Sequence, residues 1–280
     1  MKRLIIAAVL ALAVTPAGAA ERIVSLGGAI TEILFALGEG SKVVARDTTS
    51  YYPDAAWDLP DVGYVRALSA EPILSFAPDL VVATDQAAPR TALDQIESAG
   101  VPVALIPDLP TVAGTLEKIR AVAAAVGKDA EGEILAADTE RAFTALAEAL
   151  GKVEGEPEVL FILTASSGGL MAAGQHTAAE ALIELAGGRN VVQGYDGYKA
   201  LSPETATALN PAIVLITAHG LPMLGGVEAL ARRPDLGLIP AVQQGRILVV
   251  DAGLFLQFGP RAPVAIAELA QRLHPDLQQP

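Results

Sequence analysis

Two stretches of this chain repeat one another, and the duplication restricts the folds that the sequence can adopt. The segments 63–84 and 197–217 come into register when a one-residue gap is placed after the tyrosine. Each copy contains a Gly-Tyr pair, a Leu-Ser pair, a glutamate, and then a proline followed by an apolar run. A duplicated unit predicts two similar lobes, and ligand sites favour the interface between lobes.

The repeat extends upstream at a constant spacing. Residues 32–44 and 180–192 lie 148 positions apart, and each block reads as an amphipathic helix, a glycine turn and an apolar Val-Val pair. The alternative is a coincidence between two ordinary helix-turn-strand units. Matched blocks in the same order favour a shared architecture instead.

The first residues of the chain predict its compartment. Lys2 and Arg3 form a basic start, residues 4–14 are apolar, and small residues follow at 17–20. This pattern is typical of a secretory signal peptide, which we place at residues 1–20. The alternative is an N-terminal membrane anchor, but the apolar run is shorter than the ~18 residues that a spanning helix needs.

Net charge and cysteine content limit the possible binding partners, covalent modifications and location of the protein. The formal net charge is −13, and it becomes more negative when the two basic leader residues are removed. Such a surface argues against nucleic acid and anionic lipid as partners. The chain has no cysteine, so neither disulfides nor lipid attachment through a cysteine can form. An exported protein without an anchor is retained only behind a second membrane, and we therefore expect a periplasmic location.

The order of elements predicts an α/β fold. Over residues 21–114, apolar strand-like runs alternate with helical patterns, which is typical of a parallel sheet with helices on both faces. Residues 115–152 are rich in alanine and show helical spacing, interrupted at 127–129. A second α/β unit follows over residues 153–280. We expect two lobes joined by a helical connector, with lobe closure of modest amplitude because a helix is stiffer than coil.

Three stretches of the sequence resemble a known family. They are residues 23–37, residues 61–78 with the run Gly-Tyr-Val-Arg-Ala-Leu-Ser-Ala-Glu, and residues 161–182 with Met-Ala-Ala-Gly-Gln-His-Thr. The chain resembles the periplasmic substrate-binding proteins of haem ABC importers, which belong to the class III periplasmic binding proteins. That class also binds vitamin B12 and siderophores. The resemblance covers essentially the whole mature chain, and its most specific part is the Gly-Tyr-x-Arg-x-Leu-Ser-x-Glu run.

The resemblance implies two Rossmann-like lobes joined by a long helix, with haem b held in the cleft as the transported ligand. It implies that Tyr64 ligates the haem iron beside Arg66. Haem iron accepts tyrosine among its axial ligands. A free tyrosine has a pKa of ~10, so the phenolate needs the ferric charge to form at neutral pH. Arg66 can stabilise the phenolate or pair with a haem propionate. The alternative for Tyr64 is a rim tyrosine that packs its ring and hydrogen-bonds its hydroxyl.

His176 is the candidate for a second iron ligand. Thr177 and Glu180 have the spacing of a capping box, so His176 is expected just before a helix N-terminus in the lobe opposite Tyr64. Some members of the family use a histidine from this region and others lack one, and a solvated loop histidine is the alternative. Tyr198 is expected on the C-terminal side of the cleft or in the packing of that lobe.

The remaining candidates are isolated in the sequence. His219 is expected at a strand end and His274 in an exposed tail. Three scattered histidines without paired spacing argue against a zinc or manganese site. Met171 and Tyr195 could contact the ligand, although methionine more often fills gaps in a core.

The resemblance assigns Glu71 and Glu204 to docking on the permease of the importer. Both follow a Leu-Ser pair, so both also read as first-turn carboxylates of a helix, where negative charge is favourable. One acidic residue on each lobe would steer docking onto a basic permease surface. The expected partners are haem, an inner-membrane permease dimer with its ATPase and, indirectly, an outer-membrane haem receptor, and the protein is expected to be a monomer.

The sequence carries no signature of an enzyme. It contains no G-x-S-x-G motif, no P-loop and no pair of histidines at metal-ligand spacing. We therefore predict a haem-binding protein of iron acquisition that is not an enzyme. The alternatives are a cobalamin- or ferric-siderophore-binding protein of the same class and, more distantly, a secreted α/β enzyme.

Overall fold

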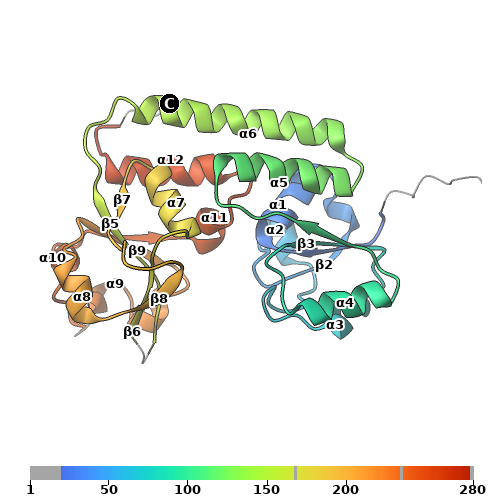
Figure 1. Cartoon of the computed structure of the whole chain (residues 1–280), viewed down its shortest axis with the longest axis horizontal. Helices are drawn as coiled ribbons and strands as arrows, with labels where there is room; N and C mark the ends of the chain where they lie inside the picture. The colour runs from blue at the N-terminus through green and yellow to red at the C-terminus, as the bar shows by residue number, and fades with distance from the viewer. Residues whose placement is uncertain (1–19, 167–168, 234–235, 278–280) are drawn as a thin grey trace, which may run out of the picture.

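The computed structural model describes residues 20–166, 169–233 and 236–277. The predicted signal peptide therefore lies outside the described residues, apart from its last residue. Figure 1 shows two lobes side by side, with long helices running across one side of both. The predicted α/β fold with two lobes and a helical connection is confirmed.

The N-terminal lobe is built on four parallel strands in the order β2-β1-β3-β4. Its elements are β1 (Ile23–Leu26), α1 (Gly28–Ala36), η1 (Gly40–Lys42), β2 (Val43–Arg46), α2 (Asp54–Trp57), α3 (Ala70–Leu74), β3 (Leu80–Thr84), α4 (Arg90–Ser98), β4 (Val103–Ile106) and α5 (Val112–Ala125).

Both faces of this sheet are covered by helices. Successive side chains of a strand point to opposite faces, so β3 contributes to two cores. Val82 packs with α1 and α5, whereas its neighbours Val81 and Ala83 pack with α3 and α4. All five residues of β3 are buried, which accounts for its unbroken apolar sequence. The segment 46–62 contains the single helical turn α2.

Helices α5 and α6 (Asp129–Leu150) form a hairpin, and α6 runs across both lobes (Figure 1). The chain turns at Gly127, whose φ of 70° lies in the region that favours glycine. A Cβ at Gly132 would lie 2.3 Å from the Cβ of Ala123, so glycine is needed where the two helices approach each other. Ala136 packs in the core of the N-terminal lobe and Phe143 in that of the C-terminal lobe. Helix α6 is therefore the connection, while α5 belongs to the N-terminal core.

The C-terminal lobe has a mixed sheet, in the order β10-β9-β5-β6-β8 with β7 beside β5. Its elements are β5 (Glu158–Ser166), β6 (Gly169–Ala173), α7 (Ala178–Leu185), β7 (Arg189–Asn190), β8 (Tyr198–Leu201), α8 (Pro203–Ala208), β9 (Ile213–Thr217), η2 (Leu221–Leu224), α9 (Val227–Leu230), α10 (Pro240–Gln243), β10 (Ile247–Val250), α11 (Ala252–Leu256) and α12 (Ala262–Leu273). Strands β6 and β8 are antiparallel, unlike any pair in the N-terminal sheet.

Candidate functional site

Tyr64 lies on the loop that leads from β2, through the helical turn α2, to α3. Gly63 precedes it with a φ of 102°, and the Gly63 N–H donates to Asp61 Oδ1 (2.7 Å). Val65 and Leu68 are buried and anchor the loop on the N-terminal core. The Tyr64 side chain is 45% exposed, and within the described residues its hydroxyl has no hydrogen-bond partner. The loop therefore holds its backbone on the core and presents the phenol outward.

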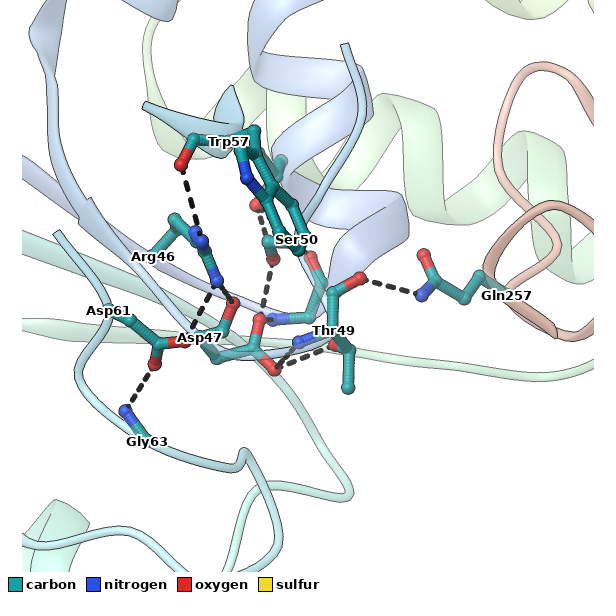
Figure 2. A network of polar contacts seen from close by, with 10 residues as sticks. Arg46, Asp47, Thr49, Ser50, Trp57, Asp61, Gly63 and Gln257 are labelled. Carbon is teal, nitrogen blue, oxygen red and sulfur yellow. Dashed lines mark hydrogen bonds and ion pairs between the residues drawn. The ribbon is translucent and has the colours of Figure 1, made fainter. Parts of the chain in front are cut away.

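A buried polar network fixes the start of this loop (Figure 2). The fully buried carboxylate of Asp47 accepts hydrogen bonds from the Ser50 hydroxyl (2.5 Å) and from the backbone N–H and hydroxyl of Thr49 (3.0 and 2.6 Å). Arg46 forms an ion pair with Asp61 (2.9 Å). A buried charged side chain is stable in a protein interior only when hydrogen bonds or an ion pair compensate its loss of hydration. The network thus sets the backbone on which Tyr64 is mounted.

Arg66 lies on the same loop as Tyr64, and its charge acts on the pKa of a tyrosine in the other lobe. Its guanidinium Nη2 donates to Gln86 Oε1, and its side chain is exposed. Across the two lobes, burial raises the pKa of Tyr198, while the backbone N–H of Ala179, the hydroxyl of Thr177 and the charge of Arg66 act in the opposite direction. The charge of Arg66 is therefore felt at the C-terminal lobe. The Tyr198 phenol, unlike that of Tyr64, is turned to the first turn of α7 in its own lobe.

His176 lies just before α7, where the capping-box spacing predicted it. Thr177 is the N-cap of α7, and its hydroxyl accepts from the Glu180 N–H (3.1 Å). The Glu180 carboxylate accepts in turn from the His176 N–H (2.6 Å). The imidazole is 81% exposed and its Nδ1 lies 3.0 Å from Asp196 Oδ1. This contact orients the ring and leaves Nε2 open, which is the arrangement that a metal-ligating histidine needs.

Tyr195 and Met171 pack within the C-terminal lobe. The Tyr195 hydroxyl donates to the carbonyl oxygen of Ala172 (3.2 Å), and the Lys199 Nζ lies 5.3 Å from the centre of its ring. Burial raises the pKa of this tyrosine. Met171 is half-buried on β6, beside β8. The Tyr195 side chain therefore bridges β6 and β8.

The other histidines differ from one another. His219 is exposed two residues after β9, at the strand end where it was expected. The expectation that His274 is exposed is wrong: it is buried, and its Nε2 lies 3.0 Å from the carbonyl oxygen of Gly187. Helix α12 packs against α6 and α7 and carries this residue into the lobe. Across the described residues, no three His, Cys, Asp or Glu side chains cluster in a way that could hold a metal ion.

Glu71 and Glu204 occupy the first turns of α3 and α8, and both are exposed. The two helix starts are not equally capped. The Ser202 hydroxyl accepts from the Thr205 N–H (3.2 Å), whereas Ser69 makes no such bond. The backbone N–H of Glu204 itself and the Ser202 hydroxyl lower the pKa of the Glu204 carboxyl. The helix-start interpretation of both residues is thus consistent with the structure.

Sequence analysis missed the polar contacts between the lobes. Lys118 is buried in α5, and its ammonium donates to the carbonyl oxygens of Gln257 (2.9 Å) and Phe258 (3.2 Å) in the other lobe. Gln257 Nε2 donates in turn to the carbonyl oxygen of Thr49, as Figure 2 shows. A lysine within the apolar helical pattern of residues 116–126 was the available signal, since a fully buried lysine needs a partner.

Tyr51 and Tyr52 make further contacts between the lobes. The Tyr51 hydroxyl donates to Asp251 Oδ1 (2.7 Å) and accepts from the Gly253 N–H (2.7 Å). Burial raises the pKa of Tyr51, and the Asp251 carboxylate raises it further. The Arg261 guanidinium lies 3.1 Å from the ring centre of Tyr52. The lobes are therefore joined by specific polar bonds as well as by α6.

A cavity of about 590 Å³ is lined by residues 152–157 and 273–277 of the C-terminal lobe. His274 is among its lining residues, but its Nε2 is engaged with the carbonyl oxygen of Gly187, and Tyr64, Arg66, His176 and Tyr198 do not line the cavity. We therefore give the cavity no part in ligand binding.

Comparison with known proteins identifies the family. A family model described as "Periplasmic binding protein" matches residues 23–254. The apo structure of the periplasmic haem-binding protein RhuT from Roseiflexus sp. RS-1 is 40% identical, with a TM-score of 0.88 over 92% of this chain and 99% of that chain. An uncharacterised ABC transporter substrate-binding lipoprotein of Bacillus subtilis is 26% identical over 91% of this chain and 81% of its own. A vitamin B12-binding protein of Yersinia pseudotuberculosis is 36% identical over 37% of each chain.

The chain belongs to the periplasmic binding protein family. Its fold is that of the two-lobed, helix-connected members, as the likeness to RhuT shows. In the portion of the chain that the structure describes, every helix is too short or too polar to cross a membrane.

Proposed function

We propose that this protein binds haem between its lobes and delivers it to an ABC importer of the inner membrane. The observation that carries the proposal is Tyr64: an exposed phenol without a hydrogen-bond partner in the described structure, beside Arg66 and on a loop that a buried network fixes. A tyrosine that served only packing would use its hydroxyl, as Tyr195 does. The likeness to a periplasmic haem-binding protein over nearly the whole chain supports haem as the ligand.

Each candidate residue then has a role. Tyr64 supplies a phenolate to the ferric iron of haem b. Arg66 stabilises that phenolate or pairs with a propionate of the haem. His176 is the second ligand, with Asp196 holding its ring through Nδ1 so that Nε2 meets the iron. Tyr198 contributes its half-buried ring to the C-terminal side of the site.

Delivery depends on the exposed acidic residues. Glu71 and Glu204 stand at equivalent helix starts, one on each lobe, and would each contact one half of a permease dimer. The protein is exported through the leader at residues 1–20 and acts in the periplasm as a monomer that binds no nucleic acid. We expect a carrier rather than an enzyme, because the family and the similar solved structures are binding proteins.

A second candidate function comes from the same class. The partial match to a vitamin B12-binding protein favours cobalamin as an alternative ligand. Cobalamin needs no phenolate from the protein, so the two ligands make opposite demands on Tyr64.

Optical titration tests the proposal and separates the two ligands. We expect the purified mature protein to give a Soret band and a high-spin, tyrosinate-type spectrum with one equivalent of hemin. The same protein should show no saturable binding of cyanocobalamin in equilibrium dialysis. Saturable binding of cobalamin without binding of hemin would replace the proposed ligand by the alternative one.

A further inference from the structure

Gln86 lies where the candidate haem site meets the contacts between the lobes. It lies two residues after the end of β3, and its backbone N–H donates to the Thr84 hydroxyl (3.3 Å). Its side-chain amide is used at both ends. Oε1 accepts from the guanidinium of Arg66, and Nε2 donates to the backbone carbonyl oxygen of Asp108 (3.4 Å). One amide therefore links the loop of Tyr64 to the loop after β4.

The position of Asp108 is itself fixed. Its carboxylate pairs with the buried ammonium of Lys118 and accepts from the Thr84 hydroxyl (3.2 Å). Lys118 in turn donates to Gln257 and Phe258 of the C-terminal lobe. The bonds thus run without a break from Arg66 to the contact between the lobes, and Gln86 is the only link in that series that is neutral and exposed.

We propose that Gln86 is the positioning residue for Arg66, holding its guanidinium over the site beside Tyr64 in the ligand-free protein. This inference rests on the proposed haem-binding function. Arginine is long and flexible, and ordering it only when the ligand arrives would weaken binding. A neutral amide orders the guanidinium while leaving its charge available to a propionate or a phenolate. A carboxylate at the same place would order it too, but would neutralise it.

The chemistry predicts a distinct effect for each substitution. Gln86→Ala frees Arg66, and we expect haem to dissociate about tenfold faster, the effect of losing one hydrogen bond to a charged group. Gln86→Glu keeps the geometry but pairs the guanidinium with a carboxylate, and we expect a larger increase in the dissociation rate. Gln95→Ala is the matched control, because Gln95 lies exposed on α4 and its side chain makes no bond in the described structure.

A double-mutant cycle separates positioning from direct contact. If Gln86 acts through Arg66, then Arg66→Ala and the double variant Arg66→Ala, Gln86→Ala should release haem at the same rate. Transfer of haem to excess apomyoglobin in a stopped-flow instrument gives these rates. Additive effects of the two substitutions would show that Gln86 contacts haem itself or supports the fold, and would overturn the inference.

A measurement without haem keeps the inference independent of the ligand. Side-chain ¹⁵Nε relaxation of Arg66 in the haem-free protein should report an ordered guanidinium in the wild type and in Gln86→Glu, and a mobile one in Gln86→Ala. An equally mobile Arg66 in the wild type would disprove the positioning role. An ordered Arg66 in a protein that does not bind hemin would disprove the proposed function and leave the positioning of Arg66 established.

Discussion

The two copies of the internal repeat share their architecture but use their tyrosines differently. Tyr64 stands on an irregular loop with its hydroxyl free, while Tyr198 begins strand β8 and pairs with Ala173 of β6. In the C-terminal lobe, Tyr198 lies on a strand that pairs with the antiparallel strand β6, and its ring packs against the core. The described strands of the N-terminal sheet pair only in parallel. The duplicated sequence therefore conserves the order of helices and strands. The antiparallel strand pairing of the C-terminal lobe engages Tyr198, whereas the hydroxyl of Tyr64 stays available to a ligand.

The largest difference between the copies should appear in haem binding. Tyr64→Phe removes the proposed iron ligand, and we expect affinity to fall by more than the ~100-fold upper range for losing an outer-shell partner of a metal. The tyrosinate-type spectrum should disappear as well. Tyr198→Phe keeps the ring and should change the affinity by less than about threefold, since its hydroxyl is used inside its own lobe. Equal losses in the two variants, by hemin titration, would erase the distinction between the lobes.

The contact between the lobes should make a large contribution to stability. Lys118→Met leaves Asp108 without its cation and two carbonyl oxygens without their donor. We expect the free energy of unfolding to fall by about 3 kcal/mol, the lower end for breaking a buried pair, because Asp108 is partly exposed. Urea denaturation followed by circular dichroism measures the change. Lys152→Met, at an exposed lysine, is the control and should leave the midpoint unchanged.

Permease docking should depend on both lobes. The double variant Glu71→Ala, Glu204→Ala should bind hemin normally but dock about tenfold more slowly in reconstituted transport at low salt, because exposed charges act mainly on association. The variant Glu117→Ala, Glu148→Ala changes the net charge equally at exposed positions of α5 and α6 and serves as the control.

Transport by the Glu71, Glu204 variant at the rate of the control would remove the docking role. The single variants test the symmetry of the two lobes. Similar losses would support one contact per permease half, whereas a loss confined to one lobe would make docking asymmetric.

The smallest effect concerns alkaline pH. The pKa of Tyr51 is raised in the folded protein, so Tyr51 stays protonated there after the unfolded chain begins to ionise near pH ~10. Its stabilisation is complete below that pH and is lost as the pH rises toward the folded value. We expect Tyr51→Phe to show a shallower loss of unfolding free energy between pH 9 and 11 than the wild type. Tyr52→Phe, which removes a hydroxyl without a hydrogen bond, should follow the wild-type slope.

The sequence predicted what depends on local pattern. Apolar runs alternating with helical patterns predicted the α/β class, the break near Gly127 separated two helices, and the capping-box spacing placed His176 before α7. The sites of Tyr64 and the two helix-start glutamates followed from the repeat and the family resemblance, and their roles stay predictions.

The contacts between distant segments could not be predicted. His274 is buried because α12 docks on α6 and α7, a packing that tail composition does not reveal. Lys118 meets Gln257 139 positions away, and Arg66 meets Gln86 with helix α3 and strand β3 between them in the chain. Each contact depends on how separate elements pack in the folded protein rather than on residue spacing.

The connecting helix has a consequence for how the molecule can come apart. The 22 residues of α6 complete one core with their first half and the other core with their second. Neither lobe has a complete hydrophobic core without its part of α6, so a cut through this helix would leave two fragments with exposed apolar faces. Because α6 is part of both cores, the two lobes should unfold as a single cooperative unit. Their relative position is then largely set before the ligand binds.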